Sequence, residues 1–217
     1  MIQRMNNYHY LVAGLPALGK DWKPAEGLDI DSIVKDIEGN CTEKDNSLIN
    51  ILLDGFDDEK LNHDFYVKAL KCGNPFLQEY FRFDLMVRNA KVRYLNKALG
   101  RDSETDTIKR TENDSEMTDL EEFNESAAVN AALGTEDILG RERALDDIMW
   151  NKIDELTTFD YFDIEAVLGF IAKLHIIGRW LRLDDATGRE MFRKLVDEVR
   201  GTFKGVEYDD EGDKVNN

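Results

Sequence analysis

The chain contains little of several residue types that mark particular classes of protein. Its 217 residues include two cysteines, Cys41 and Cys72, and three histidines. The cysteines lack the close spacing of metal-ligand pairs, and the first residues lack the apolar core of a secretory signal, so we expect reduced thiols. No histidine has a ligand-type residue at i+3 or i+4, and no glycine-rich phosphate loop follows a strand pattern. The sequence therefore predicts no metal site and no cofactor.

Long apolar runs and basic charge are scarce as well. No stretch approaches the ~18 consecutive apolar residues that a membrane-spanning helix needs, so we expect no direct membrane insertion. Basic residues number 28 against 45 acidic ones, which gives a net charge of −17. This excess of negative charge repels phosphate backbones and argues against nucleic acid as a partner. We expect a soluble, cytoplasmic protein, and basic patches on a protein partner remain compatible with its charge.

Hydrophobic residues make up 42% of the chain, which is enough for a substantial core. The clearest helix pattern runs from Tyr161 to Leu183. At about 100° per residue its apolar side chains share one face that covers roughly half of the circumference. These side chains are Ile164, Val167, Leu168, Phe170, Ile171, Leu174, Ile177 and Leu181. Because an apolar arc this wide needs several neighbours, we predict a multi-helix array packed around this central helix.

Helix patterns also fill most of the remaining chain, so the predicted fold is all-α. Three short helices are expected in residues 30–70, started by Asp29 or Asp31, by Thr42, and by Asp57 or Asp58. The longest pattern, 75–99, follows Asn74 as its cap and ends at Gly100. Further helices are expected over 118–133, where Thr118 and Glu121 fit a capping box, over 134–156, and over 191–203. Residues 7–18 are interpreted as a short extended segment or, nearly as well, as a two-turn helix.

An acidic stretch interrupts the helix patterns between Arg101 and Glu125, where ten acidic residues occur with three basic ones. The part up to Glu116 has few apolar groups to bury, so we expect a mobile acidic linker over 100–117. This linker divides the chain into an N-terminal helical half, 1–99, and a C-terminal helical half, 118–205, which packs on the first. Residues 206–217 form an acidic tail that we expect to be disordered.

One polar feature of the long helix requires an explanation, because Asp84, Arg88 and Lys91 project into the middle of its apolar stripe. Asp84 and Arg88 stand at i and i+4 with the acid first, which is the favourable order for an ion pair. In one interpretation the stripe divides around an internal ion pair, or this part of the helix faces solvent. In the other, the helix presents charge within an apolar surface to a partner protein, a use that suits arginine beside aromatic residues. No residue pattern indicates catalysis, so we expect that the protein is not an enzyme.

Three segments of the chain carry a family resemblance. They are Tyr8–Pro16 (YHYLVAGLP), then Phe83-Asp84 with Val87-Arg88-Asn89-Ala90, and then Tyr161-Phe162-Asp163 followed by Leu174 and Arg179-Trp180. Together they resemble a small bacterial family associated with V/A-type rotary ATPases, whose members stand in for the C-type (eukaryotic d) subunit. The acid followed by Arg-Asn is similar to the acid/asparagine/arginine helix of C-type subunits, although there the asparagine precedes the arginine. The chain is also shorter than a C-type subunit of three helical modules, so at least one module would be missing or reduced.

The resemblance implies a non-catalytic peripheral subunit, a C/d-like socket between the central stalk and the membrane rotor ring. The implied partners are rotary ATPase central-stalk subunits and that ring, and the implied location is cytoplasmic, peripheral to the inner membrane through the complex. The implied interface residues are Asp84, Arg88, Asn89, Arg93, Arg179 and Trp180. The alternatives are an acidic helical adaptor or regulatory protein unrelated to the ATPase, and an enzyme of a carboxylate-rich helical kind.

Overall fold

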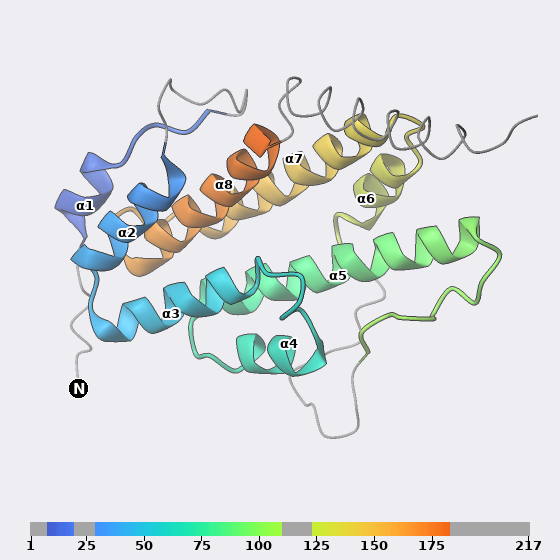
Figure 1. The fold of residues 1–217 in the computed structure, drawn as a ribbon, viewed down its shortest axis with the longest axis horizontal. Coiled ribbons are helices and arrows are strands. Elements are labelled where there is room, and N and C mark those ends of the chain that lie inside the picture. The colour runs from blue at the N-terminus through green and yellow to red at the C-terminus, as the bar shows by residue number, and fades with distance from the viewer. Residues whose placement is uncertain (1–7, 20–28, 110–122, 183–217) are drawn as a thin grey trace, which may run out of the picture. The chain divides into compact units, whose positions relative to one another are not determined.

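The computed structural model describes residues 8–19, 29–109 and 123–182, which form eight helices and no strand (Figure 1). The helices are α1 (His9–Gly14), α2 (Ile30–Asn40), α3 (Glu43–Asp54), α4 (His63–Leu70), α5 (Pro75–Ala98), α6 (Ser126–Leu133), α7 (Ile138–Leu156) and α8 (Ile164–Arg182). The predicted all-α fold is confirmed for these ranges. The capping box at Thr118, the helix expected over 191–203 and the tail over 206–217 lie outside the described residues.

The chain divides into two compact units, residues 1–178 and residues 179–217. Within the first unit α5 packs against α4, α6 and α7, so helices from both sides of the acidic stretch share one core. The boundary between the units falls inside α8 rather than at the acidic stretch. The last residues of that helix, Arg179–Arg182, belong to the second unit and are described by themselves.

Three helices begin at the caps that the sequence predicts. The side chains of Asp29, Thr42 and Asn74 each accept a hydrogen bond from a first-turn backbone N–H, at 3.1, 3.3 and 3.0 Å. These bonds satisfy amide groups that have no partner within the helix itself. They set the starts of α2, α3 and α5, and Pro75 follows its cap at the first position of α5.

The start of α4 differs from the prediction. Its cap is Asn62, whose side chain accepts a hydrogen bond from the Phe65 N–H at 3.0 Å. The prediction of Asp57 or Asp58 as the cap is wrong, because the Asp57 carboxylate accepts from the Glu59 N–H at 3.1 Å and closes a turn instead. Residues 57–62 are therefore a connection between α3 and α4 rather than part of a helix.

The N-terminal segment is the helix α1, so the extended interpretation of residues 7–18 is wrong and the helical one is confirmed for His9–Gly14. Tyr8, which precedes the helix, is only 8% exposed. Its hydroxyl donates a hydrogen bond to the Asp45 carboxylate at 2.5 Å. Burial and this acidic neighbour raise the pKa of Tyr8 to about 12. The bond attaches the start of α1 to the first turn of α3.

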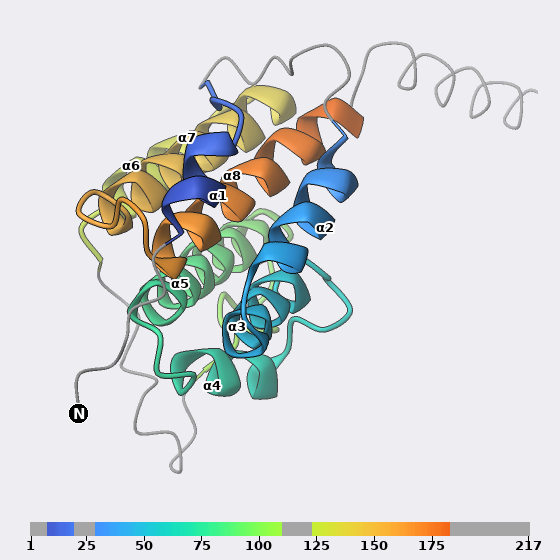
Figure 2. The ribbon, with the colours of Figure 1, turned by 90° about the vertical axis from the view of Figure 1, so that its left-hand side faces the viewer.

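The part of α8 that belongs to the first unit lies among α1, α2, α5 and α7 (Figure 2), while α5 is the helix that packs against three others. Leu168 and Leu174 on the inner face of α8 are completely buried. Gly169 lets it approach α7 closely, since a Cβ added there would lie 2.6 Å from the Thr157 methyl carbon. The helix starts at Ile164, three residues after the predicted start at Tyr161, and this difference affects the surface described below.

Candidate functional site

The charged residues in the middle of α5 make contacts with other parts of the chain. Asp84 accepts a hydrogen bond from the Tyr66 hydroxyl of α4 at 2.6 Å, and the Arg88 guanidinium lies 3.4 Å from the Asp58 carboxylate. Burial raises the pKa of Asp84, while the Tyr66 hydrogen bond and the nearby Arg88 charge oppose this effect. In place of the internal Asp84–Arg88 ion pair of one interpretation, the two residues make separate contacts to α4 and to the turn before it. Arg88 still acts on Asp84 through its charge.

Two further basic residues of α5 form ion pairs with different elements. The Lys91 ammonium lies 2.6 Å from the Glu142 carboxylate of α7. Arg93 binds both carboxylate oxygens of Glu104, with nitrogen–oxygen distances of 2.7 and 3.1 Å. Such a two-pronged geometry is the most specific one available to an arginine–carboxylate pair. Lys91 therefore connects α5 to α7, and Arg93 connects it to the segment that follows the helix.

The segment after α5, residues 101–109, is called the strap here. Asn89, which is 3% exposed, donates to the Ile108 carbonyl at 2.8 Å and accepts from the Ile108 N–H at 3.0 Å. Asn96 donates to the Thr105 carbonyl at 2.6 Å. Hydrogen bonds from Arg93 and Lys109, with a smaller contribution from their positive charges, hold the pKa of Glu104 down to about 2. Side chains of α5 thus satisfy the strap's backbone, which runs along the helix.

These contacts change the interpretation of the acidic stretch. The sequence predicts a mobile linker over 100–117, but residues 101–109 make specific hydrogen bonds to α5. The reason is that the strap needs no apolar surface of its own, because asparagine side chains of the helix bond its peptide groups. Residues 110–117 lie outside the described part of the chain.

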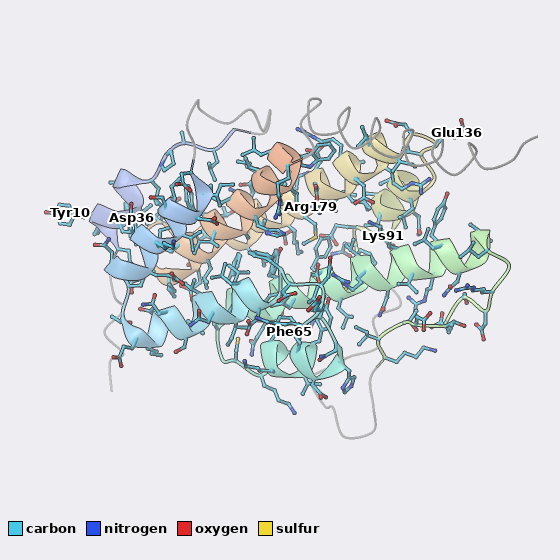
Figure 3. The ribbon with its side chains drawn as sticks, viewed as in Figure 1. Tyr10, Asp36, Phe65, Lys91, Glu136 and Arg179 are labelled. Carbon is cyan, nitrogen blue, oxygen red and sulfur yellow. The ribbon has the colours of Figure 1, made fainter. Side chains whose placement is uncertain are left out.

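The expected interface residues on α5 therefore stabilise the fold. Asp84, Arg88, Asn89 and Arg93 each bond to a group elsewhere in the first unit. They do not form an exposed row on the helix. Arg179 and Trp180, the other two expected interface residues, lie in the second unit on the last turns of α8, and both are half-buried (Figure 3 labels Arg179).

Large aromatic side chains are exposed on α1 and on the turn before α8. They are together called the aromatic patch here and are Tyr10, Phe159, Tyr161 and Phe162, which are 98%, 86%, 68% and 37% exposed. The Tyr8 N–H donates to the Phe162 carbonyl at 2.7 Å, and the His9 ring lies 3.8 Å from the Phe162 ring, centroid to centroid. These contacts bring the start of α1 to the turn before α8, and Tyr10 projects outwards from α1 (Figure 3).

The aromatic patch was not predicted from the sequence. The helix pattern placed Tyr161 and Phe162 at the start of the central helix and gave neither of them a position on its apolar face. Since α8 begins only at Ile164, both residues lie in the preceding turn and reach solvent. The alternation of aromatic and acidic residues in the sequence Phe159-Asp160-Tyr161-Phe162-Asp163 is the signal that could have indicated an exposed turn.

The chemistry of the aromatic patch suits contact with another protein. Clusters of exposed aromatic side chains are typical of protein interfaces, where each ring buries a large area. Burial and the neighbouring Asp163 charge raise the pKa of Asp160. Two carboxylates beside aromatic rings would favour a partner surface that carries basic groups. In the described ranges no group of His, Cys, Asp and Glu side chains could hold a metal ion, and no helix is long and apolar enough to cross a membrane.

A family model described as "protein of unknown function (DUF2764)" matches residues 57–202 of the chain. That range covers α4 to α8 and includes the strap and the turn of the aromatic patch. No curated protein and no solved structure matches the chain.

Proposed function

Since the chain belongs to this DUF2764 family, whose description leaves the function open, we propose a function from the chain's own residues. We propose that the protein is a non-catalytic, C/d-like socket subunit of a V/A-type rotary ATPase. In this role it connects central-stalk subunits to the membrane rotor ring from the cytoplasmic side, and it does not insert into the membrane. The proposal starts from the three segments whose residues resemble the ATPase-associated family.

One contact carries most of the support for this proposal. The first and third resembling segments meet through the bond from the Tyr8 N–H to the Phe162 carbonyl at 2.7 Å. Where they meet, Tyr10 and Tyr161 are 98% and 68% exposed. Motifs that are far apart in the sequence therefore come together at the aromatic patch, a surface suited to binding a protein. This arrangement is what a subunit with an interface role requires.

The bracing of α5 supports the mechanical part of the proposal. A socket that transmits torque needs stiff helices that do not shift past one another. Helix α5 is joined to α4 by Tyr66 and Asp84, and to α7 by Lys91 and Glu142. Partly buried polar contacts of this kind hold helices in one register, because sliding would leave the polar groups without partners. The middle of the 24-residue helix is thus held against both neighbours.

The experiment is recovery of the tagged protein from detergent-solubilised membranes of its own organism, followed by identification of the co-purifying subunits. We expect rotary ATPase subunits to co-purify with the wild type. A double variant of the aromatic patch, Tyr10→Ser with Tyr161→Ser, should recover at least about tenfold less of them, because hot-spot aromatic residues carry much of the energy of an interface. Both side chains are too exposed for their loss to unfold the protein.

The matched control is Ile138→Ser with Leu139→Ser, which removes two exposed apolar side chains of α7, 70% and 56% exposed. It should recover the ATPase as well as the wild type does. Absence of every ATPase subunit from the wild-type sample would reject the function. Recovery of an unrelated partner that depends on the aromatic patch would instead identify the chain as an acidic helical adaptor.

A further inference from the structure

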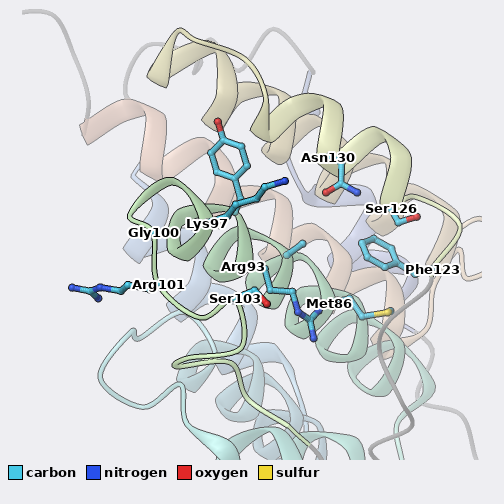
Figure 4. Close-up of a pocket in the computed structure, with 11 residues that line it drawn as sticks. Met86, Arg93, Lys97, Gly100, Arg101, Ser103, Phe123, Ser126 and Asn130 are labelled. Atoms are coloured by element: carbon cyan, nitrogen blue, oxygen red, sulfur yellow. The ribbon is translucent and has the colours of Figure 1, made fainter.

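We infer that a groove between α5 and α6 binds an acidic, apolar segment of a partner protein. The groove has a volume of about 560 Å³. One wall is a face of α5 that includes Arg93, Tyr94 and Lys97, and the other includes Phe123 and Asn130, just before and within α6 (Figure 4). Arg101, at the start of the strap, lies at its edge. This surface is separate from the aromatic patch, and the inference goes beyond the proposed function.

The groove exists because α6 presents small side chains on this side. Its large apolar residues, Val129 and Leu133, are buried in the core. The groove is lined from α6 by Ser126 and Asn130, which are too short to fill the space beside Tyr94. Two packed helices normally interdigitate their side chains and leave no such gap. The sequence of α6 therefore creates a concave surface that a further segment can occupy.

The charge of the groove selects an anionic partner. Arg93, Lys97 and Arg101 recur at intervals of four residues, and among the residues that the structure describes no acidic side chain lines the groove. Arg93 is bound to Glu104, whereas Lys97 and Arg101 form no ion pair within the described part of the chain. In a protein with a net charge of −17, a cationic row is a local exception. An acidic segment would be attracted here and repelled by most of the remaining surface.

The apolar part of the groove distinguishes a protein segment from a simple anion. Tyr94 and Phe123 contribute aromatic surface to the lining, and the Arg141 guanidinium covers the Tyr94 ring at 5.1 Å. A phosphate ion would contact only the cationic side chains and would leave the aromatic surface of the groove exposed to water. A segment that carries both carboxylates and apolar side chains would bury it, as helices docked in grooves do.

The test uses the purified full chain and three labelled synthetic peptides of equal length, measured by fluorescence anisotropy. The first combines leucine at helical spacing with glutamate, the second replaces glutamate with glutamine, and the third replaces leucine with serine. We expect the leucine–glutamate peptide to bind at least about tenfold more tightly than either of the others, since only it satisfies both charge and apolar surface. Its affinity should fall as salt is added.

The residue-level test is Lys97→Glu with Arg101→Glu, which should weaken binding of the leucine–glutamate peptide at least about tenfold. The control, Lys35→Glu with Lys44→Glu, makes the same change in net charge at exposed positions of α2 and α3 and should leave the affinity unchanged. If charge reversal unfolds the groove variant by circular dichroism, Lys97→Gln with Arg101→Gln replaces it.

The inference would be overturned if the leucine–glutamate peptide did not bind, or if either control peptide bound equally well. It would also be overturned if the groove variant lost no more affinity than the control variant. Equal binding of the serine–glutamate peptide would indicate a site for simple anions. None of these results depends on co-purification with an ATPase, so the groove and the proposed function can fail separately.

Discussion

The Tyr66 hydroxyl on α4 donates a 2.6 Å hydrogen bond to the Asp84 carboxylate on α5, and this bond joins the two helices. Tyr66 is completely buried. Burial raises the pKa values of both groups, and for Tyr66 the negative charge of Asp84 adds to the effect. The contact is therefore favourable as a hydrogen bond but retains a desolvation cost when Asp84 is ionised.

This cost predicts that Asp84→Asn stabilises the protein at neutral pH. The folded-state pKa of Asp84 is raised above its ordinary value of 3.8, so the folded protein binds the proton more tightly than the unfolded chain does. This tighter proton binding stabilises the folded protein at pH values below the ordinary pKa of 3.8. The stabilisation is lost as the pH rises through the raised pKa of the folded state. An asparagine can still accept from Tyr66 without carrying a charge. Urea unfolding should therefore show Asp84→Asn more stable than the wild type at pH 7, with the advantage shrinking towards pH 4.

The control for this prediction is Asp58→Asn, since the Asp58 side chain is 92% exposed and its carboxylate remains hydrated in the folded protein. That variant should show no comparable pH-dependent gain. A wild type that is more stable than Asp84→Asn at pH 7 would mean that attraction to Arg88 outweighs desolvation at this site.

We predict that Asn89→Ala releases the strap without unfolding the helices. The Asn89 side chain makes both hydrogen bonds to Ile108, and an alanine makes neither. The Ile108 amide should then exchange its hydrogen with solvent at least about tenfold faster, because local opening costs less once these bonds are gone. Asn40→Ala removes a side-chain bond to α2's own backbone and should leave Ile108 protected. Unchanged exchange at Ile108 would show that Asn96 and Arg93 hold the strap by themselves.

The strap also shows what the sequence could and could not predict. Helix positions followed from apolar spacing and capping residues, and Thr42 and Asn74 cap the helices as expected. Order in residues 101–109 did not follow, because it depends on polar side chains of α5 rather than on the strap's own composition. Asn89 and Asn96 stand seven residues apart, two helical turns, so they face the same side of α5. That spacing is visible in the sequence, but only the path of the strap along α5 shows that the two asparagines bind its backbone.

The candidate sites were harder to predict for a similar reason. Charges within the apolar stripe of α5 indicated an unusual role, but their partners come from elsewhere in the chain, such as Asp58 and Glu142. Periodicity identifies a face of a helix and says nothing about which acid will lie opposite a lysine. The groove is a partial exception, since the spacing of Arg93, Lys97 and Arg101 indicates a cationic row directly. Its depth depends on the small side chains of α6.

We predict that Leu174→Ala lowers the free energy of unfolding by about 2–5 kcal/mol, because the side chain is completely buried at the centre of α8 and its removal leaves a cavity. Denaturant unfolding measures this loss. The control is Leu99→Ala at the end of α5, where the side chain is 66% exposed and its truncation should cost little. A loss below about 1 kcal/mol for Leu174→Ala would show that the core around α8 collapses into the cavity.

The last prediction concerns Arg88, whose charge the sequence analysis assigned to an interface. Its guanidinium lies 3.4 Å from Asp58 and acts on Asp84, so Arg88→Glu would place a third carboxylate beside two others. We expect this variant to lose about 1–3 kcal/mol of stability, less than the about 3–5 kcal/mol of a fully buried pair, since water partly screens the site. Arg88→Gln removes the attraction without adding repulsion and should lose less. Both values come from urea unfolding, and recovery of membrane partners should fall only as far as folding does. If the Arg88→Glu protein keeps wild-type stability but loses its partners, Arg88 is an interface residue. Its contact with Asp58 would then contribute nothing to the stability of the fold.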